Sequence, residues 1–343
     1  MKAIITAGCS NYLAAISALA RSAKEHVGPH VFITCFIENE LHPAVDDIEH
    51  IDRSVLARDL PIASFDSLAF GLDLLEASTA IKPAFIQWTF DQYPDVDKVV
   101  FLDPDMLVSR DLTEVWEELD RSDILLTPHL LDDEDTFTGT QTNMLRVLRH
   151  GTFNLGFIAI RRSDEAARLV DWWARKLRWF CHDDPPSGLF VDQKWMDLAP
   201  SLFEVSLLKN RSYNVANWNV ARRQLSFEDG GFSTKDGRLA LYHFSGFFSG
   251  KDLSFLSRQL PCPDHPVFEL RRRYAKLIAD AGHETFSRVP WTYSTFVSGE
   301  VIDRASRIAH RRTPQGSGGE GQNPFSKSNT YFLPLFSSDI DHD

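Results

Sequence analysis

The most chemically suggestive stretch of this sequence is a pair of aspartates that follows a short apolar run. Asp103 and Asp105 come directly after residues 99–102, which read Val-Val-Phe-Leu, and only Pro104 separates them. Residues two apart in an extended chain point to the same side, so both carboxylates face one point. They repel one another unless a cation lies between them, and such oxygen ligands suit Mg²⁺ or Mn²⁺. The pattern predicts a buried strand with a divalent-metal site at its carboxyl end.

The same three residues are also typical of a solvent-exposed turn, because Asp and Pro are common turn residues. The apolar strand in front of the pair favours the metal site over the turn. Pro104 has no N–H to donate and therefore marks the place where regular sheet pairing ends.

The composition is that of an ordinary globular protein. At 343 residues, with 43% hydrophobic and 24% charged residues, the chain has room for one large α/β domain or for two domains. The formal net charge of −12 argues against nucleic acid or an anionic membrane as the main partner. A bound metal would reverse that sign locally for an anionic substrate.

The distribution of cysteines and apolar residues bears on location. The four cysteines are far apart and form no CxxC pair, which favours reduced thiols in the cytoplasm. The apolar run at residues 1–8 is too short for a signal peptide, and no run approaches the roughly 18 residues that span a bilayer. We expect a cytoplasmic protein without a transmembrane segment.

The elements that must position the aspartates begin with a β-α-β pattern. Residues 2–7 predict a strand, residues 12–24 a helix with apolar residues at helical spacing, and residues 30–37 a second strand. This order predicts parallel strands with ligands at their carboxyl ends, where residues 8–12 fall. No GxGxxG is present, so a dinucleotide fingerprint is absent.

The rest of the chain alternates in the same α/β manner, although residues 38–78 carry no clear pattern. We expect further strands over 97–102, 123–127, 153–160, 203–208 and 239–243. We expect helices over 79–93, 111–119 and 265–281, a helix that begins near residue 163, and another that begins within residues 188–197. The acidic, Thr-rich residues 132–142 predict a mobile loop, either an active-site lid or plain disorder. Gly156 inside an expected strand indicates a close approach of backbone or ligand.

Four strings follow one another along the chain: FLDPDMLV at 101–108, FNLGFIAIRR at 153–162, FVDQKWMDLAP at 190–200 and YHFSG at 242–246. Together with the turn after the first strand, they resemble nucleotide-sugar-dependent glycosyltransferases of the GT-A fold. The chain is most similar to the retaining, family 8-like group that includes bacterial lipopolysaccharide galactosyltransferases and glycogenin. It also resembles bacterial glycosyltransferase-like proteins of unsettled acceptor.

This resemblance covers roughly residues 1–260 and implies a domain organisation. We expect a GT-A domain over 1–260, which is Rossmann-like, with a mixed, mostly parallel central sheet flanked by helices. A C-terminal helical extension over 261–312 and a flexible tail over 313–343 would follow, because residues 315–321 are rich in Gly and Ser.

The resemblance also implies a metal centre. Asp103 and Asp105 match the metal-binding aspartates of the family, and His243 matches its third protein ligand, a histidine on a late strand. The ion expected there is Mn²⁺ or Mg²⁺.

Further positions match the residues that hold the sugar donor. Asn11 and Tyr12 match the positions that bind base and ribose, and Lys82 matches a basic residue on donor phosphate or sugar. Asn154 matches the asparagine of the family's Phe-Asn-x-Gly strand, which faces the donor sugar. Lys251 corresponds to the lysine of the family's His-x-x-Gly-x-x-Lys pattern, which binds the diphosphate.

The catalytic positions implied by the resemblance are Asp192 and Gln193, which match the Asp-Gln pair beneath the anomeric carbon. With retention, the leaving phosphate oxygen takes the acceptor proton and no protein base is needed. An inverting enzyme would instead need a carboxylate near the acceptor hydroxyl, for which Asp183 and Asp184 are the candidates.

Two departures from the family pattern stand out. Lys251 lies two residues later than the His-x-x-Gly-x-x-Lys spacing places the lysine. The turn at residues 8–10 reads Gly-Cys-Ser, where closer relatives place an aspartate on the base. The first departure affects whether Lys251 binds the diphosphate. The second affects whether the base of the donor is uracil.

The function expected is metal-dependent transfer of a hexose from a nucleotide-diphosphate sugar, such as a UDP-sugar, to an acceptor hydroxyl with retention. The acceptor is a carbohydrate, a lipid-linked sugar, a small molecule or a protein. Three alternatives stay open: a nucleotide-sugar-binding protein without turnover, a haloacid-dehalogenase-like phosphotransferase, and a sugar-1-phosphate nucleotidyltransferase.

Overall fold

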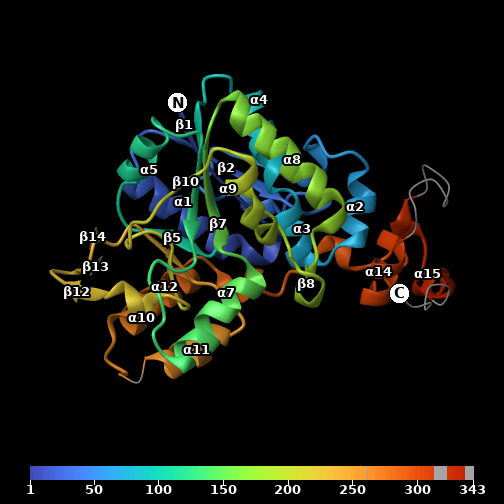
Figure 1. Cartoon of the computed structure of the whole chain (residues 1–343). Helices are drawn as coiled ribbons and strands as arrows, with labels where there is room; N and C mark the ends of the chain where they lie inside the picture. The colour runs from blue at the N-terminus through green and yellow to red at the C-terminus, as the bar shows by residue number, and fades with distance from the viewer. Residues whose placement is uncertain (261, 313–322, 337–343) are drawn as a thin grey trace.

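The computed structural model describes residues 1–260, 262–312 and 323–336, and is organised around one seven-stranded sheet (Figure 1). The strand order is β10-β6-β7-β4-β1-β2-β3. All neighbouring strands are parallel except that β7 runs against both β6 and β4. The strands of this sheet are β1 (Lys2–Gly8), β2 (Val31–Phe36), β3 (Arg53–Leu56), β4 (Lys98–Leu102), β6 (Ile124–Pro128), β7 (Phe153–Arg161) and β10 (Ser206–Leu207).

Helices cover both faces of the sheet, which is why its strands are apolar on both sides. The helices are α1 (Leu13–His26), α2 (Phe65–Gly71), α3 (Leu74–Ala80), α4 (Lys82–Gln92), α5 (Thr113–Glu118), α6 (Phe137–Gly139), α7 (Leu145–His150), α8 (Asp164–Phe180), α9 (Ala199–Leu202), α10 (Val220–Arg223), α11 (Lys251–Gln259), α12 (Pro266–Asp280), α13 (His283–Phe286), α14 (Arg304–Arg312) and α15 (Asn329–Phe336).

Alternate side chains of β1 show how the two layers form. Ile5 lies in a buried cluster with Phe85 of α4 and Trp173 of α8, whereas its neighbour Ile4 lies in a second cluster with Leu19 of α1. Ser163 begins α8 as expected, because its hydroxyl accepts a hydrogen bond from the Ala166 N–H at 3.1 Å. The sheet is therefore a rigid layer whose strand ends can hold a site.

Three smaller sheets lie outside the central one. The first has the order β11-β15-β5 and contains β5 (Met106–Val108), β11 (Val215–Ala216) and β15 (Leu241–His243). The others are the meander of β12 (Ser226–Glu228), β13 (Gly231–Thr234) and β14 (Gly237–Arg238), and the pair β8 (Asp183–Asp184) and β9 (Leu189–Phe190). Short 3-10 helices include η1 (Ser10–Tyr12), η6 (Gln193–Leu198), η7 (Thr292–Ser294) and η8 (Pro324–Ser326).

The α/β class and the mostly parallel sheet flanked by helices are confirmed. The pattern-poor residues 38–78 supply the edge strand β3 and the helices α2 and α3. The helix expected over 79–93 is divided at Ile81 into α3 and α4, and the strand expected over 203–208 shortens to β10.

The mobile loop expected over 132–142 is wrong for its second half. From Phe137 the chain is helical through α6, a π-helical turn at 140–144, and α7. The Thr136 hydroxyl starts this segment by accepting a hydrogen bond from the Gly139 N–H at 3.0 Å. The buried carboxylate of Glu134 anchors it, since it accepts hydrogen bonds from Asn143 and Arg222 at 2.7 and 2.6 Å.

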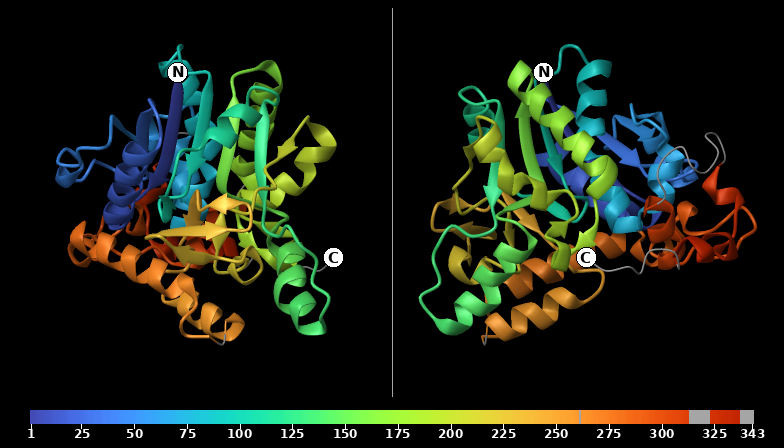
Figure 2. Two further views of the ribbon diagram at one scale, coloured as in Figure 1. Left: turned by 90° about the vertical axis from the view of Figure 1, so that its left-hand side faces the viewer. Right: turned by 45° about the vertical axis from the view of Figure 1, so that its right-hand side comes forward.

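The C-terminal residues pack on the N-terminal half instead of standing apart. The indole of Trp291 donates to the Ile37 carbonyl at 2.8 Å, and the Arg307 guanidinium donates to the carbonyls of Phe70 and Leu72 at 2.9 and 2.7 Å. The right-hand view of Figure 2 shows α14 and α15 at one side of the molecule, where α14 packs against α2.

The flexible tail expected over 313–343 needs correction over residues 323–336. These residues form η8 and α15, and Phe325 and Phe332 are buried around the ring of Phe70. Their aromatic side chains gain enough burial to hold the segment in place. Residues 313–322 and 337–343, including the Gly/Ser-rich run, lie outside the described residues. Within the described ranges, no helix has both the length and the apolar character to cross a membrane.

Candidate active site

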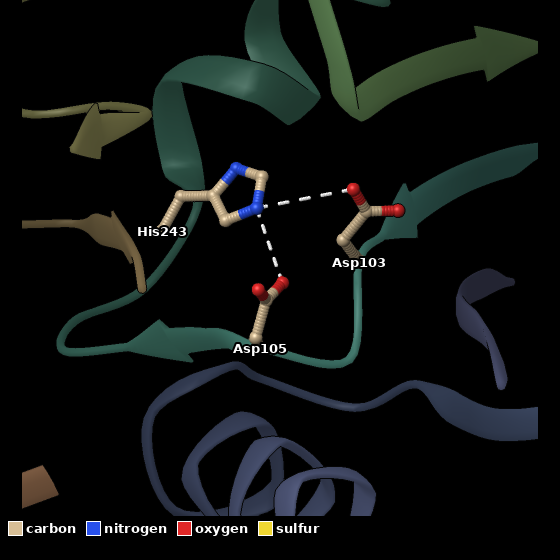
Figure 3. A group of neighbouring side chains, drawn as sticks. All are labelled: Asp103, Asp105 and His243. Carbon is tan, nitrogen blue, oxygen red and sulfur yellow. Dashed lines mark ion pairs between the residues drawn. The ribbon is translucent and has the colours of Figure 1, made fainter. Parts of the chain in front are cut away.

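Two aspartates and one histidine converge at the carboxyl end of the central sheet (Figure 3). The His243 Nε2 atom lies 3.1 Å from an Asp105 carboxylate oxygen and 3.9 Å from an Asp103 carboxylate oxygen. Ligands that share a metal at about 2.1 Å lie roughly 3 to 4 Å apart, and carboxylate oxygens with one imidazole suit Mn²⁺ or Mg²⁺. The donor set therefore fits the divalent ion that the sequence predicts.

The aspartates owe their position to a change of sheet at Pro104. Asp103 follows β4, and its N–H donates to the Gly156 carbonyl of β7 at 2.8 Å. The chain then leaves the central sheet, and β5 pairs antiparallel with β15, so that Met106 lies opposite His243. The Phe244 N–H donates to the Asp105 carbonyl at 2.8 Å, which fixes the histidine beside the second aspartate.

Gly156 is the point where backbone and imidazole come closest. A Cβ atom on this residue would lie 2.6 Å from His243 Cε1 and 2.8 Å from Asn154 Oδ1. Both distances are shorter than a van der Waals contact allows, so only glycine fits here. The close approach that the sequence predicts at Gly156 is confirmed, and the group that approaches is His243.

A hydrogen-bond network orients the imidazole. The His243 Nδ1 atom lies 3.2 Å from Asn154 Oδ1, which also accepts a hydrogen bond from Asn214 Nδ2 at 3.1 Å. With the amide oxygen facing it, Nδ1 carries the proton and Nε2 is the atom that faces the carboxylates. Such a partner holds a metal-ligating histidine in one tautomer and orientation.

A buried lysine links the metal cluster to the proposed catalytic aspartate. Lys82 begins α4, is 2% exposed, and its Nζ lies 3.2 Å from Asp103 and 3.0 Å from Asp192. The same Nζ donates to the Leu155 carbonyl at 2.8 Å. We call Lys82, Asp103, Asp105, Asp192 and His243 the floor of the site.

Burial and charge act against one another on the floor. Burial lowers the pKa of the His243 imidazole, but the Asp105 and Asp103 carboxylates outweigh it and hold that pKa above its ordinary value. Burial raises the pKa of Asp192 to about 6, against the pull of the Lys82 ammonium. The Lys82 pKa is likewise lowered by burial and raised more by Asp103 and Asp192, so the ammonium stays charged.

The floor opens into one cavity of about 760 Å³, the larger of the two described cavities. Nearly all of the sequence-predicted site residues line it. These are Tyr12, Lys82, Asp103, Asp105, Asn154, Asp192, Gln193, His243 and Lys251. A cavity of this size accommodates a ligand larger than a single sugar.

The two predicted donor-binding residues after β1 differ in whether they line the cavity. Tyr12 lines the cavity, and burial together with the charges of Asp105 and Asp103 raises the pKa of its phenol. Asn11 does not line the cavity, and its side-chain oxygen is buried without a hydrogen-bond partner in the described part of the chain. The predicted contact of Asn11 with a base or ribose therefore stays a prediction.

Gln193 and Lys251 both line the cavity but come from different parts of the chain. The Gln193 amide donates to the His150 carbonyl at 2.9 Å, and its oxygen lies 3.4 Å from the Asn154 amide nitrogen. Lys251 is exposed and is the first residue of α11, after left-handed glycines at 246 and 250. The two additional residues before Lys251 are accommodated in this turn, and the lysine reaches the cavity.

Asp183 and Asp184, the alternative general bases, form β8 outside the described cavity lining. β8 pairs antiparallel with β9, and the Asp183 N–H donates to the Glu76 carboxylate at 3.0 Å.

Several residues that sequence reasoning missed also line the cavity. His129, Asn143, Arg146 and Trp218 are among them. Asn214 supports Asn154 from outside the lining. The cluster of Asn and Trp at 214–219 was the available signal for two of these residues, whereas Arg146 lies just after the segment 132–142 that was expected to be a loop.

Comparison with known proteins gives distant similarities. No protein-family model matches the chain. Uncharacterized protein YfnF of Bacillus subtilis (strain 168) is 26% identical over 231 residues, which cover 63% of this chain and 72% of YfnF. The solved structure of the galactosyltransferase LgtC with donor and acceptor sugar analogs is similar at 16% identity and a TM-score of 0.46, over 84% of this chain and 97% of that one.

A second solved structure is a glycosyltransferase involved in the glycosylation of the major capsid of PBCV-1. It is 9% identical, covers 74% of this chain and 98% of its own, and has a TM-score of 0.40. These values are too low to assign the chain to a family.

Proposed function

We propose that this protein is a metal-dependent glycosyltransferase that moves a hexose from a nucleotide-diphosphate sugar to an acceptor hydroxyl. The observation that carries the proposal is the convergence of Asp103, Asp105 and His243 in a cavity next to the Lys82–Asp192 ion pair. Three of the four sequence strings that resemble GT-A enzymes supply four of the five floor residues, and Lys82 is the exception. The GT-A unit would span residues 1–260, with 261–312 as its extension.

The floor provides the chemistry that such a transfer requires. A divalent ion held by Asp103, Asp105 and His243 would supply Lewis-acid stabilisation of charge on a departing diphosphate. Lys82 adds a fixed positive charge from a buried position, where electrostatic stabilisation is strongest. Tyr12 lies at the end of β1, beside the aspartates, where a base or ribose would bind.

Retention is favoured by the state of the carboxylates in the cavity. Within the described lining, Asp103 and Asp105 belong to the metal cluster and Asp192 pairs with Lys82. The remaining lining aspartate, Asp73, caps α3 by accepting a hydrogen bond from the Glu76 N–H at 2.9 Å. None of the four is free to act as general base on an acceptor, so the leaving phosphate would take the acceptor proton.

In this reading Asp192 and Gln193 lie beneath the anomeric carbon and stabilise its developing positive charge. Asn154 contributes to the same subsite through its contacts with Gln193 and His243. Lys251, which also lines the cavity, approaches the diphosphate.

The haloacid-dehalogenase reading is less well supported. That chemistry needs a nucleophilic aspartate after the first strand of its domain. Here Asp103 follows β4, and β1, β2 and β3 precede it along the chain. The binding-protein reading predicts donor binding without turnover, and the experiment below separates it from the enzyme.

The purified protein would be incubated with Mn²⁺ and a panel of nucleotide sugars while released nucleoside diphosphate is measured. We expect slow release from one UDP-sugar, and Asp105→Ala to reduce it by at least about 100-fold. Glu117→Ala, which removes an exposed carboxylate of α5, is the matched control and leaves the rate unchanged.

Donor binding without release in the unmodified protein would favour the binding-protein reading. Absence of both binding and release across the panel would contradict the proposed function.

A further inference from the structure

We call the part of the cavity lined by Asn143, Arg146, Trp218 and Lys251 its wall. Two helical segments that project from the body of the molecule supply three of these residues. In Figures 1 and 2 the segment 137–150 and α11 lie side by side at the end remote from the N-terminus. They are joined by a hydrogen bond of 3.1 Å from the Gln259 amide to Asn143 Oδ1. The same two segments carry Arg146, Lys251 and Arg258, and we call these three residues the rim.

The two arginines of the rim share one aromatic ring. The Arg146 guanidinium lies 4.7 Å from the centroid of the Phe255 ring, and the Arg258 guanidinium lies 5.9 Å from it. The ring attracts each cation, but it cannot neutralise either charge. Burial and the neighbouring Arg258 lower the pKa of Arg146, so the two charges disfavour one another.

No carboxylate among the described residues forms an ion pair with Arg146 or Arg258, although the chain has a formal net charge of −12. Other arginines nearby are neutralised: Arg222 pairs with Glu134, and Arg271 with Asp252, both at 2.6 Å. Arg146 lines the cavity, and Arg258 lies next to it at the Phe255 ring, outside the lining residues. An unneutralised pair of guanidinium groups is an arrangement that binds a phosphate or carboxylate.

A second feature of this wall points to a ligand. Trp218 lines the cavity with its ring centroid 5.3 Å from that of His243, is 9% exposed, and its indole Nε1 has no hydrogen-bond partner in the described residues. A buried N–H of this kind costs free energy unless a ligand accepts from it. The wall therefore offers one neutral donor near the metal cluster and two cations farther out.

We propose that this wall binds the acceptor and that the acceptor is anionic, with a phosphate or carboxylate held by Arg146 and Arg258. The inference rests on the proposed function, because the donor would occupy the part of the cavity between Tyr12, the metal cluster and Asp192. The receiving hydroxyl then lies on the side of Trp218.

The experiment measures binding of small probes to the protein loaded with Mn²⁺ and UDP. Methyl β-glucopyranoside is the neutral probe, methyl β-glucopyranosiduronate carries a carboxylate, and glucose 6-phosphate carries a phosphate. We expect at least one charged probe to bind about tenfold more tightly than the neutral one. Which charged probe binds better distinguishes the two anions.

The variant Arg146→Gln/Arg258→Gln is expected to reduce binding of the charged probe to the level of the neutral one. Arg149→Gln is the matched control, because it removes the same charge from the same helix outside the cavity lining, and it keeps the preference. Circular dichroism checks that the exposed substitutions leave the fold intact.

Equal binding of all probes, no binding of either charged probe, or a preference that survives in the double variant would overturn the inference. So would a loss of UDP affinity in the double variant equal to the loss of probe affinity, because the arginines would then contact the donor. Failure of the proposed function has a separate signature, which is absence of UDP and Mn²⁺ binding in the unmodified protein.

Discussion

The floor and the rim of the cavity hold their charged side chains in different ways. On the floor, acids and bases neutralise one another: Lys82 lies between Asp103 and Asp192, and His243 lies beside Asp105. The rim carries Arg146 and Arg258 with no paired carboxylate in the described chain. The charged side chains of the floor have partners within the protein, whereas we propose that those of the rim find theirs in a ligand.

The two regions also differ in how the backbone supports them. Asp103, Asp105 and His243 of the floor lie at the ends of β4, β5 and β15, where ladder hydrogen bonds fix their positions, and Lys82 and Asp192 lie at the starts of α4 and η6. The rim lies on helical segments joined by side-chain contacts, such as that of Gln259 with Asn143. This comparison predicts that substitutions on the floor affect folding and metal binding, while those on the rim affect ligand affinity alone.

The largest effect is expected from Lys82→Met. The substitution leaves the buried carboxylate of Asp192 without its cation, so the free energy of unfolding should fall by about 3 to 5 kcal/mol. Urea denaturation measures the change. Lys209→Met, at an exposed position, is the control and should have no effect.

Adding Asp192→Asn to Lys82→Met should recover part of that loss, because the unpaired charge is then removed. If Lys82→Met unfolds at the same urea concentration as the unmodified protein, the floor is not held together by this ion pair, and the contrast with the rim disappears.

An intermediate effect is expected from Gly156→Ala. The added methyl group would lie within 2.8 Å of both His243 and Asn154, so the imidazole must move. Calorimetric titration should show Mn²⁺ affinity reduced by about 10- to 100-fold. Gly28→Ala is the control, since its Cβ would meet only Asp111, at 3.8 Å. An unchanged affinity would show that His243 does not ligate the ion.

The smallest effect is expected from Lys251→Gln on the rim. The side chain is exposed, so its charge is screened by water, and loss of affinity for UDP in the presence of Mn²⁺ should be at most about fivefold. Lys235→Gln provides a comparison at another exposed lysine. A loss of UDP affinity as large as that caused by Asp105→Ala would show that Lys251 contributes as strongly as the floor residues.

The sequence by itself determined the local parts of this architecture. The β-α-β opening follows from apolar periodicity, and the strands over 97–102 and 153–160 follow from runs that are apolar on both faces. Asp103 and Asp105 could be identified because they lie close together in the chain, so the sequence alone shows that a cation could bind between them. Gly156 could be identified because glycine is unusual inside a strand.

Only the tertiary structure decided which distant residues meet. His243 reaches Asp105 because β5 leaves the central sheet and pairs with β15, and local sequence does not specify that pairing. Lys82 joins Asp192, far along the chain, because α4, which begins at Lys82, packs against α8, and the indole of Trp173 in α8 donates to the Asp192 carbonyl at 3.2 Å. The rim could not be predicted from the sequence for the same reason. The helix that carries Arg146 is stabilised by the contact between Glu134 and Arg222, which forms only in the folded chain.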